Sequence, residues 1–364
     1  MRCSVWPIAG AILFMAAAGA RADQDSAMPR YAHIVVIIEE NHTADQIIGS
    51  AAAPNINRLA KDYGYASNFY AERHPSEPNY VAIVGGDTFG IADDDAFWCK
   101  PKQIVAGCPH ANSAGYVDHT VTAPGLTDQL ASHALSWKGY FESIPEPGSR
   151  VWRWPAESSP VPGKPLALYA SKHNGFINFR SVQADPAIAS HIVGFDALDR
   201  DIAGNTLPAY AHVVPNQCND MHGLHGREVP ADCVKGEALV KRGDALAGVL
   251  VDKLMHSAAW NAAGNFAIVI TFDENDDDTP TQHPVACCGG GPGDPHNPGG
   301  GWIPTIVITN HGPRHLTDPT PYNHYSLLRT TEAAFGISDY LGHAADAAKG
   351  VRTMAPLFAV ATQK

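Results

Sequence analysis

The sequence predicts a doubly wound α/β sandwich, in which helices cover both faces of a mostly parallel β-sheet. Several short apolar runs rich in Val, Ile and Phe have the character of strands buried on both faces. Helix-like segments alternate with these runs along the chain, which is typical of βαβ units. Clusters of polar residues follow three of the runs, at the position where parallel sheets bind ligands. The fold class is therefore α/β.

The expected elements follow from these patterns in order along the chain. Strands are expected at His33–Ile38, 66–71, Ala209–Val214, Phe266–Phe272 and Ile303–Thr309. Helices are expected at 55–62, from 77 to about 85, at 126–137, at 237–257 and at Tyr325–Phe335. The helix over 237–257 has the clearest pattern, because its leucines recur on one face.

Composition and charge exclude several classes of protein. The chain has 364 residues, of which 45% are hydrophobic, so it can bury a sizeable core and is neither disordered nor fibrous. Its net charge is −12 and it has no cluster of Lys and Arg, which argues against nucleic acid as a partner. An acidic chain suits a protein that gathers carboxylates around metal ions.

The first residues have the pattern of an export signal. Arg2 precedes an uncharged, alanine-rich stretch that ends in the small-x-small sequence Ala20-Arg21-Ala22. We therefore expect a signal peptide over 1–22, a single catalytic domain over 23–364, and a secreted or periplasmic protein. The apolar stretch is too short to span a bilayer, so we expect no stable membrane anchor.

Six cysteines follow the expected leader. In an exported chain they indicate disulfides. We favour the pairs Cys99–Cys108 and Cys218–Cys233, because each would close a short loop. The adjacent Cys287-Cys288 could form a vicinal bridge, contribute to two longer bridges or bind a soft metal ion.

Polar residues gather where three of the expected strands end. The clusters are Glu39-Glu40-Asn41-His42, Asn216 with Asn219-Asp220-Met221-His222, and Asp273 to Asp278. Any one of them is typical of turns and helix caps. The carboxyl ends of parallel strands meet at one edge, however, where carboxylates that repel each other need a proton or a cation. Oxygen ligands with some imidazole suit a divalent ion such as Zn²⁺, Mg²⁺, Ca²⁺ or Mn²⁺.

A serine stands between two prolines after the second expected strand, in the sequence His74-Pro75-Ser76-Glu77-Pro78-Asn79-Tyr80. The segment lies where a loop is expected to become a helix, and the free N–H groups of a helix N-terminus can receive a phosphoryl oxygen. A helix-capping serine is the alternative explanation. As a nucleophile, Ser76 would need activation, which a divalent ion can provide.

Five sequence blocks carry a family resemblance in the order IVVIIEENHTADQIIG, HPSEPNYVAIVGGDTFGI, CNDMH, ITFDEND and YNHYSLLRTTEAAFG. They resemble the phosphoesterase family of bacteria and fungi, which holds secreted acid phosphatases and phosphatidylcholine-type phospholipases C. The resemblance spans about residues 32–338. It implies an alkaline-phosphatase-like three-layer α/β/α sandwich, in agreement with the periodicity.

The resemblance also implies a set of site residues. Ser76 matches the nucleophile that accepts the phosphoryl group, and His74 is a second catalytic candidate. The implied metal ligands are Glu40, Asn41, Ser76, Asp273 and Glu274. Weaker candidates for a second metal ion or for phosphate oxygens are Asn79, Asn216, Asp220 and His222. Asn216 replaces the acid that is usual at a second metal site, and Tyr80 replaces the Arg of sulfatases, which argues against a sulfatase.

The function that we expect is metal-dependent hydrolysis of phosphate monoesters through a phosphoserine, with a histidine that protonates the leaving group. One alternative is a phospholipase C or other phosphodiesterase on the same core, with a phospholipid as substrate. The other is a non-catalytic exported metal-binding protein, although such a protein would need no nucleophile at Ser76. The substrate would depend on the loops 93–124, 145–185 and 279–301.

Nine further histidines lie outside the matched clusters, His119 and His173 among them. We expect most of them to be solvated or structural.

Overall fold

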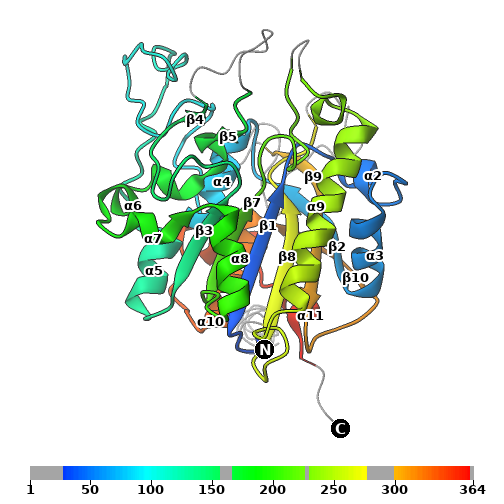
Figure 1. Cartoon of the computed structure of the whole chain (residues 1–364). Helices are drawn as coiled ribbons and strands as arrows, with labels where there is room; N and C mark the ends of the chain where they lie inside the picture. Colours follow the sequence, from blue (N-terminus) through cyan, green and yellow to red (C-terminus); the bar gives the residue numbers. More distant parts are fainter. Residues whose placement is uncertain (1–27, 156–165, 226–228, 277–298, 361–364) are drawn as a thin grey trace, which may run out of the picture.

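The structure is a computed structural model that describes residues 28–155, 166–225, 229–276 and 299–360. The expected leader, the pair Cys287-Cys288 and the last acids of the third polar cluster lie outside the described residues. In the part that is described, helices cover both faces of a large central sheet, which confirms the predicted sandwich (Figure 1).

The described strands include all five that the sequence predicts. Their bounds are β1 (His33–Glu39), β2 (Gly64–Ala71), β3 (Trp137–Phe141), β4 (Arg153–Trp154), β5 (Tyr169–Ala170), β6 (Ile192–Val193), β7 (Tyr210–Val214), β8 (Phe266–Phe272), β9 (Gly301–Thr309) and β10 (Leu316–Asn323). The central sheet has the order β10-β2-β9-β8-β1-β7-β3-β6, and β4 pairs with β5 in a separate ribbon.

Strand direction explains where the site forms. Strand β1 lies in the middle of the sheet and pairs parallel with both β7 and β8. Strand β9 pairs antiparallel with β8 and with β2, while every other pair in the central sheet is parallel. The carboxyl ends of β1, β2, β7 and β8 therefore meet at one edge of the sheet, and β9 begins at that same edge.

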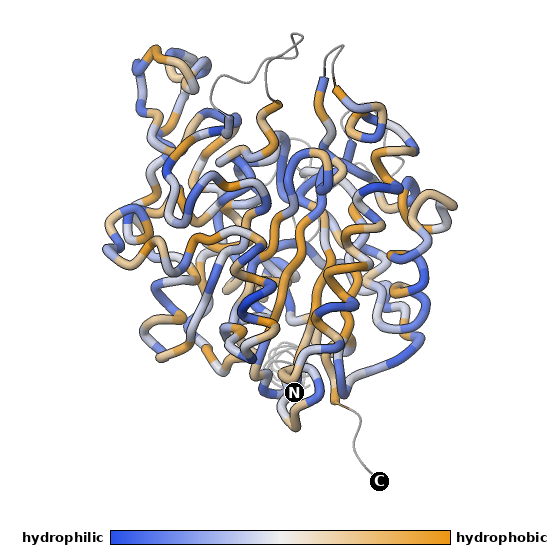
Figure 2. Tube along the Cα trace, viewed as in Figure 1, coloured by the Kyte–Doolittle hydropathy of each residue, from blue (hydrophilic) through white to orange (hydrophobic). Residues whose placement is uncertain are grey.

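The core lies along the central strands. Every residue of β8, with the sequence FAIVITF, is buried, and β1 is buried from Ile34 onward. β-branched side chains pack well on a pleated surface that is covered on both faces, which is why these runs form strands. Figure 2 shows the hydrophobic residues concentrated in these central strands. A rigid, buried sheet thus supports the polar edge.

Helices pack on both faces of the sheet. The longer ones are α3 (Pro54–Asp62), α4 (Ser76–Gly85), α8 (Phe195–Gly204), α9 (Glu237–Met255) and α10 (His324–Phe335), and the shorter ones are α2 (Ala44–Ile47), α5 (Leu126–Ser132), α6 (Arg180–Ala184), α7 (Ile188–His191) and α11 (Ala355–Phe358). Figure 1 shows α3, α8 and α9 on the near face of the sheet and α4 and α10 behind it. In the described ranges, no helix combines the length and the apolar character that crossing a membrane requires.

Several elements differ from the prediction, which omitted β4, β5, β6, α2, α6, α7, α8 and α11. The helix expected over 126–137 ends at Ser132, because His133 and Ala134 leave the helical conformation and Ala134 has φ 54°. Strand β3 begins at Trp137 instead. Strand β10 was not expected at all.

Both predicted short-range disulfides are present, Cys99–Cys108 and Cys218–Cys233. Each pair is buried in a small apolar cluster of its own, apart from the main core. The bridges therefore stabilise long connections that contain little regular structure.

Candidate active site

The carboxyl ends of the central strands bring the predicted residues together. Glu40 follows β1, Asp273 and Glu274 follow β8, and Ser76 begins α4 shortly after β2. The backbone N–H of Asn41 donates to Oδ1 of Asp273 at 3.1 Å, which joins the two segments that follow β1 and β8. Acids from both halves of the chain thus surround one serine.

The hydroxyl of Ser76 faces two carboxylates. Its Oγ lies 3.2 Å from Oε2 of Glu40 and 3.4 Å from Oε1 of Glu274. The N-cap position of α4 belongs to Pro75, so Ser76 is the first helical residue and does not cap the helix. The alternative explanation of this serine as a cap is therefore wrong. In the first turn of α4, Pro78 has no N–H and the N–H of Glu77 donates to Oδ1 of Asp94 at 3.0 Å, so the N–H of Ser76 is the one that this turn offers to an anion.

Buried carboxyl groups dominate the electrostatics of the site. Burial and the charge of Asp273 raise the pKa of Glu40 well above its usual range, and burial raises that of Asp220 in the same way. Burial raises the pKa of Asp273 to about 6. Burial, together with Asp273, raises that of Glu274 to about 8. Ionised carboxylates at such short range need a neighbouring positive charge.

The donor set fits a divalent cation. Within the described residues, Oδ2 of Asp273 is buried and accepts no hydrogen bond. The carboxylates of Glu40 and Glu274 lie on either side of Ser76 Oγ, and Asn41 lines the same cavity. Carboxylate, amide and hydroxyl oxygens are the ligands that hard divalent ions prefer. A bound ion would occupy the orphaned oxygen and balance the like charges.

His74 holds one of these carboxylates in place. Its Nδ1 lies 2.9 Å from Oε2 of Glu274, and its Nε2 lies 2.8 Å from Oδ1 of Asn275. Both ring nitrogens therefore face side chains of the segment after β8. This geometry argues against the predicted catalytic role of His74, and we regard it as a positioning residue for Glu274.

Asn79 fixes the turn that precedes Ser76. Its Oδ1 accepts hydrogen bonds from the backbone N–H groups of Glu72 and Arg73, both at 3.0 Å. Its Nδ2 donates to the Arg73 carbonyl at 2.6 Å and lies 3.4 Å from Oε2 of Glu274. The amide is fully buried and already bonded, so its contacts do not fit the predicted role in binding phosphate.

Asn216 is likewise engaged in local structure. Its Oδ1 accepts from the backbone N–H groups of Cys218 at 3.1 Å and Asn219 at 3.2 Å. Its Nδ2 donates to Oγ of Ser143 at 3.1 Å. These are the bonds of an Asx turn. The predicted use of Asn216 as a metal or phosphate ligand therefore has no support in its contacts.

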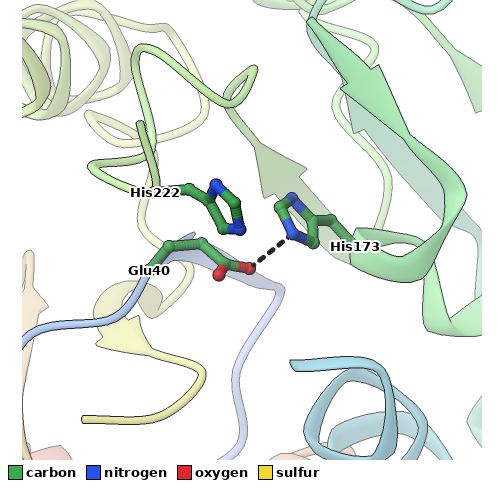
Figure 3. Close-up of side chains that lie close together, drawn as sticks. All are labelled: Glu40, His173 and His222. Carbon is green, nitrogen blue, oxygen red and sulfur yellow. Dashed lines mark ion pairs between the residues drawn. The ribbon is translucent and has the colours of Figure 1, made fainter. Parts of the chain in front are cut away.

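Asp220 and His222 do reach the site, together with His173, for which the sequence predicts a solvated or structural role. His173 Nε2 lies 3.1 Å from Oε1 of Glu40, and its Nδ1 lies 3.3 Å from Oδ2 of Asp220. Figure 3 shows the side chains of Glu40, His173 and His222 pointing toward one another from three separate segments. Their ligand atoms lie within 4.8 Å of one another, which makes them candidates for binding a metal ion.

The surroundings of both imidazoles lower their pKa values and so favour the neutral form. Burial and the positive charge of Lys172 lower the pKa of His222 to about 3. The same causes lower that of His173 well below its usual range. The Nδ1 of His222 lies 2.6 Å from the Gly223 carbonyl, so the proton of the ring is at Nδ1 and Nε2 carries the lone pair.

Lys172 is a second residue that sequence reasoning missed. Its Nζ lies 2.9 Å from Oδ2 of Asp94 and 3.2 Å from Nε2 of His222. Although burial opposes the charged form, Asp94 and Glu40 raise the pKa of Lys172 above its usual value. The side chain therefore brings a permanent positive charge to the site.

Part of this site lines a cavity of about 310 Å³. Its lining includes Asn41, Ser76, Lys172, His222 and Glu274. The cavity thus joins a serine hydroxyl and a candidate cation site to an ammonium group. This combination suits the binding and displacement of a small anionic group such as a phosphoryl group.

A buried network fixes the residue after the serine. Oε1 of Glu77 lies 2.8 Å from Nδ1 of His119, whose Nε2 lies 3.1 Å from Oδ1 of Asp93. Asn178 also donates to Oε1 of Glu77, at 2.6 Å. Although burial opposes it, hydrogen bonds to Asp93 and Glu77 raise the pKa of His119 to about 10. The contacts of Glu77 with His119 and Asn178 therefore fix the position of the first turn of α4.

Comparison with known proteins gives a family match and two kinds of relative. Residues 50–338 match the model of the Phosphoesterase family. The phosphatidylinositol-3-phosphatase of Mycobacterium tuberculosis is 30% identical over 316 residues, which cover 86% of this chain and 79% of that protein. The phosphate-repressible acid phosphatase of Penicillium chrysogenum is 26% identical over 293 residues, covering 79% of this chain but only 56% of that longer protein.

A solved structure supports the fold. A protein of the alkaline phosphatase superfamily from Vibrio parahaemolyticus has a TM-score of 0.53 at 12% sequence identity, over 86% of this chain and 68% of that one. At this identity the likeness concerns the fold alone. It agrees with the layered α/β architecture described above.

Proposed function

Because this chain belongs to the phosphoesterase family and is a hydrolase of phosphoric esters, we propose that it hydrolyses phosphate monoesters through a phosphoserine at Ser76. The observation that carries the proposal is the position of Ser76 Oγ, 3.2 Å from a Glu40 oxygen and 3.4 Å from a Glu274 oxygen. A protein that only bound metal would need no hydroxyl between its carboxylates. Both relatives are named as phosphatases, which favours monoesters over the phospholipase C alternative.

The proposed cofactor is a divalent metal ion. Its ligands would be Glu40, Asn41, Ser76, Asp273 and Glu274, and the orphaned Asp273 oxygen and the raised carboxyl pKa values support this assignment. When bound, the ion would supply positive charge that lowers the pKa of a serine hydroxyl and offsets the charge of phosphoryl oxygens.

In the first step, Oγ of Ser76 attacks phosphorus while the bond from phosphorus to the alcohol oxygen breaks. The hydroxyl proton moves first to Oε2 of Glu40, the nearest carboxylate oxygen. The alcohol takes one proton from water and Glu40 returns the serine proton to water, so that the products are the alcohol and phosphoserine and Glu40 is again in its starting state. The Lys172 ammonium stabilises the negative charge that develops on the phosphoryl and leaving oxygens. This electrostatic role of Lys172 takes the place of the predicted histidine acid, because the lowered pKa values of His173 and His222 disfavour a protonated imidazole here.

In the second step, water attacks the phosphorus of phosphoserine and the bond from phosphorus to Oγ breaks. Ser76 regains a proton from the water, and inorganic phosphate is released. The N–H of Ser76, at the start of α4, and the Lys172 ammonium bind the phosphoryl oxygens in both steps.

The proposed location is a secreted or periplasmic one, supported by the two disulfides. The proposed substrate is a small phosphate ester.

Replacing the nucleophile tests the function. Ser76→Ala should lower turnover of 4-nitrophenyl phosphate by at least about 10³-fold, while the metal content measured by elemental analysis stays close to that of the wild type. Phosphate should be trapped covalently on the wild type at low pH and not on the variant. The exposed Ser190→Ala serves as the matched control. Turnover retained by Ser76→Ala would exclude the phosphoserine mechanism. Hydrolysis of bis-aryl phosphates in preference to the monoester would instead favour the phosphodiesterase alternative.

A further inference from the structure

A second cavity adjoins the catalytic one. It has a volume of about 290 Å³, and Asp94, Lys172 and His225 belong to its lining as well as to that of the catalytic cavity. The two cavities therefore meet at these three residues. A molecule bound with one end near Ser76 could extend past Lys172 into the second space.

The chemistry of the second cavity differs from that of the first. Trp152, Leu166, Ala167 and Leu224 contribute apolar surface to it. The catalytic cavity, by contrast, is lined mainly by acids, amides, imidazoles and lysines. Arg153, Ser171 and Gln217 add polar groups to the lining, but apolar surface beside a charged site favours a ligand that is charged at one end and apolar at the other.

Each disulfide supports one part of this lining. Trp152 packs against the small cluster around Cys99–Cys108. Leu166 and Leu224 pack against the cluster around Cys218–Cys233. The two clusters are separate from the main hydrophobic core. The disulfides therefore stabilise the parts of the cavity lining that do not pack against that core. The cavity is thus a built feature of the fold.

The β4–β5 ribbon connects the Trp152 side of the second cavity to Lys172. Arg153 pairs with Ala170 across the ribbon, and the Arg153 guanidinium lies 4.2 Å from the centre of the Trp152 ring. The turn that carries Lys172 begins directly after β5. The ribbon therefore holds the lysine at the junction of the two cavities.

We propose that the second cavity is the leaving-group site of the enzyme and accepts an apolar, ring-containing alcohol. The inference rests on the proposed function, because it places the phosphoryl group of the same monoester in the catalytic cavity beside Ser76. Lys172 then lies where the ester oxygen passes between the cavities, in position to stabilise the charge of that oxygen. The substrate class is that of aryl and similar apolar phosphate monoesters.

Two aryl phosphates of similar leaving-group acidity, phenyl phosphate and 2-naphthyl phosphate, separate the effect of apolar size from that of intrinsic reactivity. The wild type should have the higher kcat/KM for the naphthyl ester. Leu224→Ala should lower kcat/KM for 2-naphthyl phosphate by about tenfold and change that for phenyl phosphate much less, because the contact that it removes reaches only the larger ring. Ala170→Leu adds bulk to the same cavity. It should also lower kcat/KM for 2-naphthyl phosphate more than kcat/KM for phenyl phosphate.

Inhibition by inorganic phosphate reports whether the catalytic cavity of each variant is intact, and it should match the wild type. Val249→Ala, on the exposed side of α9, is the matched control for truncating an apolar side chain. The deciding quantity is the ratio of kcat/KM for 2-naphthyl phosphate to kcat/KM for phenyl phosphate. If this ratio is the same in the wild type, Leu224→Ala, Ala170→Leu and Val249→Ala, the leaving-group site is overturned and the proposed function stands. Absence of any monoester turnover in metal-loaded wild type would overturn the proposed function, and this inference with it.

Discussion

Nζ of Lys172 lies 3.2 Å from Nε2 of His222, so that the ammonium donates a hydrogen bond to the one ring nitrogen that carries a lone pair. His222 is also one of three residues that gather as candidate metal ligands, with Glu40 and His173. A lysine at this position uses the lone pair that a metal ion would need. The ammonium therefore supplies the positive charge that a second cation would bring, and we expect one metal ion per chain, bound beside Ser76.

The first prediction concerns this lysine. Lys172→Met should lower kcat/KM for an aryl phosphate by about 100-fold, because a fixed positive charge aimed at the reacting oxygens is lost. Elemental analysis should find one divalent ion per chain in both the wild type and the variant. Lys253→Met, which removes an exposed lysine paired with Asp199, is the control. Two ions per wild-type chain would contradict the assignment.

The second prediction concerns Asp273. Asp273→Asn keeps an oxygen that can accept the hydrogen bond from Asn41 but loses the negative charge, so the fold should persist while the affinity for the metal ion falls by at least about tenfold. Titration of the chelator-treated protein with Zn²⁺, Mg²⁺, Ca²⁺ or Mn²⁺ measures the affinity, and activity should return on adding the ion. Asp199→Asn is a control at an exposed acid. Unchanged affinity in Asp273→Asn would remove this residue from the ligand set.

The third prediction is a dependence of stability on pH through His119. In the folded protein its pKa is raised from 6.5 to about 10, by Asp93 and Glu77 acting against burial. A raised pKa means that the stabilising contribution is complete below pH 6.5, declines as the pH rises and is lost above about 10. The difference in free energy of unfolding between the wild type and His119→Gln should therefore shrink between these two pH values.

Urea unfolding at several pH values across this range measures the difference. His256→Gln, at a residue that is largely exposed, controls for the loss of an imidazole. A difference between the wild type and His119→Gln that stayed constant or grew with pH would refute the ion-pair network behind α4.

The central strands could be predicted because their chemistry is local. β1 and β8 are rich in Val and Ile, with phenylalanines at both ends of β8, and such runs form strands where both faces are covered. β3 was missed because Lys138 and Gly139 interrupt its apolar pattern. Tertiary packing explains the glycine, since a Cβ at Gly139 would lie 2.6 Å from the ring of Phe141. That constraint is invisible in a local pattern.

Strand β10 was missed for a different reason. It contains Pro319 and Pro321, which argue against a strand because proline cannot donate to a neighbouring strand. The strand lies at the edge of the sheet, and its pairing with β2 shifts register between Asp318 and Pro321. An edge strand with an irregular register tolerates proline. Its position in the sheet, which the sequence does not reveal, decides the outcome.

Some residues of the candidate site could be predicted from the sequence and others could not. Its acids could be located because they directly follow strands that were themselves predictable. Lys172 and His173 lie on a short 3-10 turn, and a close approach of two backbones nearby places His173 beside Glu40. A Cβ at Gly175 would lie 2.1 Å from the carbonyl oxygen of Tyr80, so only glycine permits that contact. The adjacent Lys-His pair was the single signal in the sequence, and it does not identify a partner.

Strand β9 has a consequence for how such enzymes can diverge. Because it runs against its neighbours, it starts at the polar edge, and the N–H of Asn275 donates to the Gly300 carbonyl at 2.9 Å. The chain departs from the sheet after β8 and rejoins it at nearly the same point. The registers of β8 and β9 are therefore set by their own residues and by this anchor, and a change in the number of residues between Asp276 and Gly299 is expected to leave the acids after β8 in place.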